Sequence, residues 1–212
     1  MAPDPTQTES PLEPVARSSA RSRALSGDRP DNRARCALLS SRRMRLSELG
    51  YEDIPHLSCL FEQTKMYPLL MDSPTRFIDV AAIVACATRL YATSGGLGAW
   101  QARTLDGAFI GLFSLLPIYR SADVEIHVRL KPEAWGRWYA IEGTHLLCRQ
   151  AFEVVGLPRL FGFCHPEHQR VRRILARFGF RDLGPCEHRR QIAHRYELDA
   201  ATWHERNAAL TH

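Results

Sequence analysis

The chain has 212 residues, a formal net charge of +5 and a hydrophobic content of 45%, which fits one enzyme-sized globular domain. No apolar stretch approaches the roughly 20 residues that a membrane-spanning helix requires, so we expect no membrane partner. The basic balance, which is almost entirely arginine, keeps nucleic acid open as a partner, although no motif of a known RNA-binding module occurs.

The first 43 residues differ from the rest of the chain in composition. They are rich in Pro, Ser and Arg, contain eight arginines against five acidic residues, and show little apolar periodicity. This composition predicts a disordered tail, and it lacks the central apolar stretch of a signal peptide. Met44 is a candidate start of the protein, because MRLSEL begins the first predicted strand. We therefore expect a tail over 1–43, a folded domain over 44–200 and a C-terminal tail over 201–212.

The remaining sequence alternates between strand and helix patterns, as an α/β protein does. Ser73 and Pro74 suit the N-cap and first turn of a helix, Gly95-Gly96 breaks the chain, and Asp106-Gly107 is a strong hairpin signal. The predicted elements are a strand at 44–48, helices at 51–64 and 73–92, strands at 97–103, 108–116 and 122–130, a helix at 139–155, a strand at 159–164, a helix at 167–178 and a closing pair of strands.

The stretch from Glu125 to Ala140 carries the most specific pattern. Alternation with polar residues predicts a half-buried strand whose apolar residues are Val124, Ile126, Val128 and Leu130. The apolar residues then recur at helical spacing, so a helix begins just after Gly136. The unpaired N–H groups at a helix start favour a phosphate or pyrophosphate, because the oriented amides and the helix dipole both attract an anion. A plain turn is the alternative interpretation.

The segment that follows adds to this pattern. The helix ends near Gly156 and Pro158, and the short apolar run Leu160–Cys164 predicts the next strand. A second amphipathic helix is closed by Gly179, and its apolar residues at i, i+3, i+4 and i+7 are Val171, Ile174, Leu175 and Phe178.

This arrangement resembles the core of the GNAT superfamily of acetyl-CoA-dependent N-acetyltransferases, in particular the branch of ribosomal-protein N-terminal alanine and serine acetyltransferases. That branch carries a strand with Glu-Ile-Gly, then Trp-Gly-x-Gly-Tyr-Ala-x-Glu-Ala, and later Pro-x-Asn and a closing Gly-Phe. The matching residues here are Glu125-Ile126, Trp135-Gly136-Arg137, Tyr139-Ala140, Glu142, Pro166 and Gly179-Phe180. The order and spacing hold over roughly 44–198, and the specific part covers 122–180.

The resemblance implies a GNAT fold, with a mixed central sheet flanked by helices and a splayed pair of strands that forms the acyl-CoA cleft. It implies acetyl-CoA as co-substrate, no metal, and an acceptor cleft with one wall made by the two helices at 51–64 and 73–92. Backbone amides near Val128 and Arg129 would polarise the thioester carbonyl. The cofactor-binding residues implied by the resemblance are Val128, Arg129, Leu130, Gly136, Arg137, Trp138, Tyr139, Ala140 and His168.

Several positions depart from the family pattern. Trp138 stands at the second Gly of the phosphate loop, His168 at the usual Asn, and Val171 at a small residue. The backbone N–H of Trp138 still suits a phosphate, provided that the side chain points away from it. Family members often carry a Tyr as the acid on the second helix, where this chain has Leu175, so no acid is assigned.

Glu125 is the predicted general base, acting directly or through water, because it matches the family position on the central strand. A free Glu of pKa near 4.3 is too weak a base, so burial is expected to raise its pKa towards about 6–7. The alternative role is a structural carboxylate that pairs with Arg129 or His127. His127 replaces the usual Gly and is itself a candidate second base or pocket wall.

Six cysteines occur singly, without a CxxC motif, which favours free thiols in a cytoplasmic setting over a disulfide framework. Cys164 lies near His165 and His168, but further ligands at zinc spacing do not follow, so we predict no metal site there. The second helix carries three arginines on one face that would serve as a rim for coenzyme A phosphates, an RNA contact or a solvated surface: Arg170, Arg173 and Arg177.

The sequence therefore predicts an N-acetyltransferase that uses acetyl-CoA and acts on a protein N-terminus or a small-molecule amine, as a monomer or homodimer. Two other classes stay open. The departures at Trp138 and His168 are compatible with a non-catalytic acyl-CoA-binding or partner-binding module. The excess of basic residues is compatible with a toxin-like enzyme that acetylates aminoacyl-tRNA.

Overall fold

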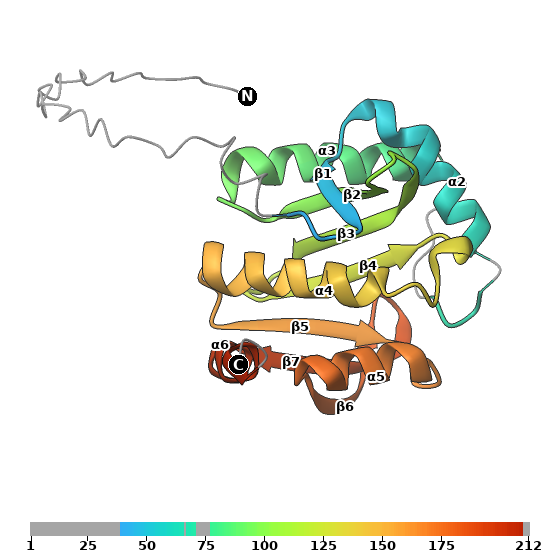
Figure 1. Cartoon of the computed structure of the whole chain (residues 1–212). Helices are drawn as coiled ribbons and strands as arrows, with labels where there is room; N and C mark the ends of the chain where they lie inside the picture. Colours follow the sequence, from blue (N-terminus) through green and yellow to red (C-terminus); the bar gives the residue numbers. More distant parts are fainter. Residues whose placement is uncertain (1–38, 66, 71–76, 210–212) are drawn as a thin grey trace, which may run out of the picture. The chain divides into compact units, whose positions relative to one another are not determined.

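The computed structural model describes residues 39–65, 67–70 and 77–209. In this part of the chain, seven strands form one mixed sheet in the order β1-β2-β3-β4-β5-β7-β6 (Figure 1). Neighbouring strands are antiparallel except β4 and β5, which are parallel and share a single residue pair, Glu125 with Phe161. The strands are β1 (Met44–Glu48), β2 (Gly98–Thr104), β3 (Phe109–Pro117), β4 (Val124–Leu130), β5 (Arg159–Cys164), β6 (Arg181–His188) and β7 (Gln191–Asp199). The mixed sheet with a splayed strand pair, which the resemblance implied, is confirmed.

The helices follow the predicted order, with irregular turns at two of their ends. The helix predicted at 51–64 begins as the 3-10 turn η1 (Tyr51–Asp53), and the helix predicted at 139–155 ends in the π-helical turn η3 (Gln150–Val154). The predicted N-cap Ser73-Pro74 lies outside the described residues. The helices are α2 (Ile54–Thr64), α3 (Phe77–Thr93), η2 (Pro132–Ala134), α4 (Tyr139–Arg149), α5 (Gln169–Phe178) and α6 (Ala200–Ala209).

Side chains alternate along β2 and β3 into two separate cores, because successive residues of a strand point to opposite faces. Ala99 and Leu112 pack with α2 and α3, whereas Trp100 and Phe113 pack with residues of α4, α5 and α6. Helices therefore cover both faces of the sheet, and α4 runs beside β4 (Figure 1). This placement brings the start of α4 to the point where β4 and β5 separate.

Gly143 allows α4 to pack directly on β3. A Cβ atom at this position would lie 1.9 Å from Cε1 of Phe113, whose side chain has no exposed surface. A buried ring cannot move aside without displacing its other neighbours, so only glycine fits here.

The described chain extends beyond both predicted domain limits. Leu39 is buried in the core, and Ser40 forms an isolated bridge with Arg45, so contacts begin before residue 44. Residues 200–209 form α6 where the sequence predicted a tail from 201, and Trp203 is 3% exposed in the core that holds Phe152. One buried indole in a ten-residue polar helix gives little apolar periodicity, which explains why the pattern predicted no helix.

Two further observations bear on the sequence predictions. The five cysteines in the described part of the chain, Cys59, Cys86, Cys148, Cys164 and Cys186, are free thiols, and Cys36 lies outside it. Among the described residues, no helix combines the length and the apolar character needed to cross a membrane.

Candidate active site

A cavity of about 1050 Å³ opens where β4 and β5 separate. One wall is the β4 segment from Ile126 to Leu130, and the opposite wall is the β5 segment from Gly162 to Cys164 together with α5. The loop after α2, from Tyr67 to Leu70, closes another side. The predicted cofactor-binding residues that line this cavity are Val128, Arg129, Leu130, Gly136, Trp138, Ala140 and His168, whereas Arg137 and Tyr139 do not line it.

The start of α4 carries no side-chain cap. Its N-cap residue is Trp138, and the first intrahelical hydrogen bond runs from the Glu142 N–H to the Trp138 carbonyl. The N–H groups of Tyr139, Ala140 and Ile141 therefore have no partner within the helix. A Cβ atom built on Gly136 would meet nothing within 4 Å, so the loop before the helix is open at Gly136, and Gly136, Ala140 and Ile141 all line the cavity.

Trp138 adopts a left-handed backbone conformation with φ of 70° and ψ of −6°. This conformation costs a residue with a Cβ roughly 1–2 kcal/mol, a cost that glycine would avoid. The guanidinium carbon of Arg177 lies 5.6 Å from the centre of the indole ring. An exposed cation–π contact contributes about 0.5–1 kcal/mol, so this contact does not offset the backbone strain.

Residues 41–43 hold the loop that precedes α4. The Ser41 hydroxyl donates to Glu142 at 2.6 Å, and Arg43 forms an ion pair with the same carboxylate at 3.0 Å. Arg43 also donates to the Arg137 carbonyl at 3.2 Å. The segment that was predicted as a tail thus supports the loop at the cavity, and Arg137 contributes through its backbone.

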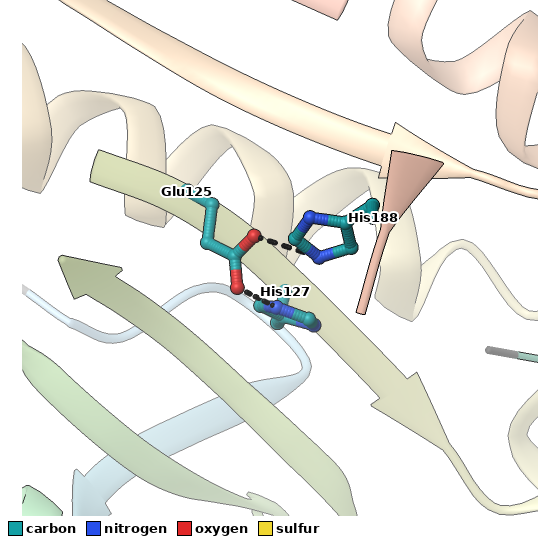
Figure 2. Close-up of side chains that lie close together, drawn as sticks. All are labelled: Glu125, His127 and His188. Atoms are coloured by element: carbon teal, nitrogen blue, oxygen red, sulfur yellow. Dashed lines mark hydrogen bonds and ion pairs between the residues drawn. The ribbon is translucent and has the colours of Figure 1, made fainter. Parts of the chain in front are cut away.

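Glu125 is the buried centre of a polar cluster on β4 (Figure 2). Its Oε1 atom lies 2.5 Å from Nε2 of His127 and also accepts from the Arg189 guanidinium. The Nε2 atom of His188 lies 3.2 Å from Oε2, within ion-pair range but out of line for a hydrogen bond. Both imidazoles line the cavity, and Glu125 lies behind them.

The environment of Glu125 overturns the expected direction of its pKa. Burial by itself would raise this pKa, but contacts with His127 and His188 and the charges of His127 and Arg189 outweigh burial and hold it well below its ordinary value. The expected rise towards about 6–7 is therefore wrong, because it counted burial without the cationic partners. A carboxylate whose pKa is held this low accepts a proton poorly, so Glu125 is unsuited to be the general base. The imidazoles of His127 and His188, which line the cavity, are the other groups of this cluster that can accept a proton.

The hairpin of β6 and β7 supplies two cluster residues that the sequence did not reveal, His188 at the end of β6 and Arg189 in the turn. His188 stacks on Phe163 of β5, with ring centres 3.9 Å apart, and this contact carries the turn over β5 towards Glu125. Arg189 and Arg190 form a two-residue turn with φ of 49° and 64°, values that Asn and Gly adopt more readily. No local motif marks these residues, since their role depends on where the last hairpin folds.

The remaining polar groups of the cavity lie along β5 and α5. Burial and the charges of Arg170 and His165 lower the pKa of His168, which favours the neutral imidazole with its one donor and one acceptor. Burial raises the pKa of the Cys164 thiol to about 11, which disfavours the thiolate and any nucleophilic role. Leu175, whose side chain cannot donate a proton, lines the cavity on α5.

Among the described residues, one group of side chains has donor atoms close enough for a metal ion. These are Glu125, His127 and His188, with donor atoms within 4.8 Å of one another. Two imidazoles and a carboxylate form a ligand set that zinc accepts. The Arg189 guanidinium already binds one carboxylate oxygen, however, and its charge opposes a second cation. The arrangement is a hydrogen-bonded cluster, and Cys164, His165 and His168 form no comparable group.

Comparison with known proteins identifies the region that contains this site. Residues 43–181 match the model of the Acetyltransferase (GNAT) domain. The matched region includes β4, the start of α4 and α5, whereas His188 and Arg189 lie outside it.

Individual relatives agree with this match. Over 105 residues the chain is 30% identical to the FsC-acetyl coenzyme A-N(2)-transacetylase of Aspergillus fumigatus, an overlap of 46% of this chain and 43% of that protein. The match thus spans less than half the length of this relative. Two solved structures share the fold: an acetyltransferase from Agrobacterium tumefaciens (TM-score 0.66, 19% identity, 76% of this chain and 92% of that one) and RimL, a ribosomal L7/L12 alpha-N-protein acetyltransferase in complex with coenzyme A (TM-score 0.65, 15% identity, 76% and 97%).

Proposed function

Since this chain belongs to the GNAT acetyltransferase family, we propose that it is an N-acetyltransferase that moves an acetyl group from acetyl-CoA to a primary amine. The observation that carries the proposal is that one cavity joins the uncapped start of α4 to the two imidazoles beside Glu125. The first feature suits an anion and the second suits proton transfer, and an acetyltransferase needs both.

The residues at the start of α4 fit the diphosphate of the co-substrate. Oriented N–H groups, the helix dipole and the open space at Gly136 favour an anion there. Acetyl-CoA would supply the thioester, and the N–H groups near Val128 and Arg129 are the proposed donors that polarise its carbonyl oxygen.

Within this proposal, His127 in its neutral form accepts the proton of the acceptor amine as the nitrogen bonds to the thioester carbon. The imidazolium that results is the charged form that favours an ionised Glu125. The carbon–sulfur bond then breaks and releases the coenzyme A thiolate. Glu125 acts through His127: it fixes the orientation of the imidazole and stabilises the imidazolium that forms. His188, which also faces the cavity, is the proposed second imidazole for proton transfer.

The proposed acceptor is an α-amino group, either of a protein N-terminus or of a small molecule. An α-amino group of pKa about 8 is neutral in roughly one molecule in ten at pH 7, against about one in 2,500 for a lysine side chain. The alpha-N-protein and N(2) acceptors named for RimL and the Aspergillus enzyme support this choice. The five free thiols support a reducing, cytoplasmic setting.

The proposal is tested by measuring thiol release from acetyl-CoA with peptides that carry a free N-terminal serine or alanine, and with small amino compounds. General base catalysis contributes roughly 10²–10⁴ in rate, so we expect His127→Gln to lower kcat at least 100-fold while the Kd for CoA changes less than twofold. Glu125→Gln should lower kcat in the same way. His165→Gln is the matched control, because His165 does not line the cavity.

Two results would contradict this function. Tight CoA binding without thiol release for any amine would make the chain a non-catalytic acyl-CoA-binding module. An unchanged kcat in His127→Gln would remove His127 as the base.

A further inference from the structure

Trp138 and Arg177 stand together at the rim of the cavity, and the proposed chemistry uses neither side chain. Resting on the proposed function, we infer that they bind the adenosine 3′-phosphate end of coenzyme A. The indole stacks on the purine base, and Arg177 with Arg173 binds the 3′-phosphate.

The exposure of Trp138 supports a ligand rather than a packing role. The side chain is 52% exposed although the residue lines the same cavity as Gly136. Its backbone is held in the left-handed region that glycine would occupy without strain. Trp135, three positions earlier, behaves differently: its indole N–H donates to the Leu130 carbonyl at 3.0 Å, and its ring packs on Tyr67. Trp135 is thus a structural residue. In the described part of the chain, the side chain of Trp138 makes no comparable packing contact that would compensate for its backbone strain.

The arginines of α5 supply the charge that a phosphate needs. Arg170, Arg173 and Arg177 lie at i, i+3 and i+7, which places them on one face of the helix. Within the described residues, none of the three has a carboxylate within ion-pair distance. Among the described residues that line the cavity, Glu167 is the only acidic one, against the arginines of α5, so this part of the lining is positively charged overall.

The adenosine end of coenzyme A has the chemistry that these side chains recognise. A purine presents a flat aromatic face, and stacking on an aromatic side chain binds a base without reading its edge. A 3′-phosphate carries up to two negative charges and accepts paired hydrogen bonds from a guanidinium. Arg177 lies over one face of the indole, so the base would stack on the opposite face while the guanidinium binds the phosphate. The start of α4, which immediately follows Trp138, would hold the diphosphate between them.

The test is a calorimetric comparison of three ligands with the full chain: CoA, 3′-dephospho-CoA and 4′-phosphopantetheine, which lacks the adenosine. We expect Trp138→Gly to weaken CoA binding roughly tenfold and to leave the affinity for 4′-phosphopantetheine within twofold, because only CoA carries the base. Its Tm should not fall, since glycine relieves the backbone strain. Arg177→Gln should weaken CoA several-fold but not 3′-dephospho-CoA. Arg181→Gln is the control, because Arg181 pairs with Glu197 and does not line the cavity.

The outcomes separate this inference from the function on which it rests. If the unaltered chain binds CoA but Trp138→Gly binds it equally well, the adenosine site is wrong and the acetyltransferase proposal stands. Equal binding of CoA and 3′-dephospho-CoA by the unaltered chain would remove the phosphate contact. If the unaltered chain binds none of the three ligands at millimolar concentration, both proposals fail.

Discussion

Arg189 and Glu125 lie 64 residues apart in the sequence, yet the Arg189 guanidinium donates directly to the Glu125 carboxylate. The contact places a fixed positive charge beside a carboxylate that is 2% exposed. It comes from a turn whose two arginines both have positive φ, a conformation that native proteins retain mainly where the surroundings impose it. The last hairpin of the sheet thereby controls the charge of a group on the central strand.

Arg189→Asn is expected to disturb catalysis through Glu125 without breaking the turn, because Asn adopts the left-handed conformation readily. Loss of the guanidinium should raise the pKa of Glu125, weaken its hold on His127 and lower kcat by about tenfold, with the acidic limb of the pH profile moved. Arg190→Asn provides the control, since Arg190 shares the turn and has no contact with Glu125 among the described interactions. Equal effects of the two variants would show that turn stability alone matters.

The pKa of Glu125 also predicts how stability depends on pH. Its pKa in the folded protein is held below the ordinary value of 4.5, so the unfolded chain binds the proton more tightly. The stabilisation is therefore complete above about pH 4.5 and is lost as the pH falls further towards the folded pKa. Calorimetry should show the Tm difference between the unaltered chain and Glu125→Gln shrinking below pH 4.5. A difference that stays constant from pH 7 to pH 3.5 would contradict this assignment.

Gly143→Ala should destabilise the fold because the added methyl group would overlap the Phe113 ring. Overpacking in a well-filled core costs about 1–3 kcal/mol, which lowers Tm by several degrees in a domain of this size. Chemical unfolding measures the loss directly. Adding Phe113→Leu should recover part of it, since the smaller side chain makes room. If the losses of unfolding free energy in the two single variants simply add in the double variant, the added methyl group does not clash with the Phe113 ring.

A chain that begins at Met44 is expected to be less stable and to bind CoA more weakly than the full chain. It loses the buried side chain of Leu39 and the contacts of Ser41 and Arg43 with Glu142 and the loop before α4. Burial of one leucine contributes about 1.5–3 kcal/mol as an upper estimate. The full chain with Ser41→Ala and Arg43→Gln separates the loss of stability from the loss of CoA binding. Its Tm should lie close to that of the unaltered chain, whereas its affinity for CoA should be lower. Identical Tm and Kd values for all three proteins would refute this role.

Chelation tests the prediction that the reaction needs no metal. Treatment with EDTA followed by gel filtration should leave acetyl transfer unchanged, because the Arg189 charge opposes a cation at Glu125. Removal of that charge in Arg189→Asn should make the two imidazoles and the carboxylate more open to Zn²⁺. Metal analysis of both proteins after dialysis against Zn²⁺ measures this. Stoichiometric zinc in the unaltered protein, with activity lost on its removal, would reverse the prediction.

Local patterns predicted most of the fold because the apolar residues of most helices and strands recur at the spacing of the element they form. The strands at 44–48 and 159–164 and the hairpin at Asp106-Gly107 lie where alternation and turn chemistry placed them. Patterns failed where one long-range contact decides the structure. The helix α6 depends on the burial of Trp203, and the contacts of residues 39–43 depend on where β1 and α4 meet.

The candidate site was predictable in the part that lies on one continuous stretch, from β4 to the start of α4. The charges that surround Glu125 were not predictable from the sequence. The direction of the Glu125 pKa depends on His188 and Arg189, which the sheet order brings beside β4 from the far end of the chain. The position of Glu125 on the strand was therefore predictable, whereas the direction of its pKa shift was not.

The single residue pair between β4 and β5 has a mechanical consequence. The strands from β1 to β4 and those from β5 to β7 are joined by antiparallel ladders of five to seven residue pairs, two of which contain a register shift. The sheet therefore has its weakest pairing between β4 and β5. A molecule seated in the cavity would touch both of these strands and tie the two half-sheets together, in addition to its chemical role. When the cavity is filled, hydrogen exchange should therefore slow together for amides of both half-sheets, because the ligand replaces the strand pairing that β4 and β5 lack.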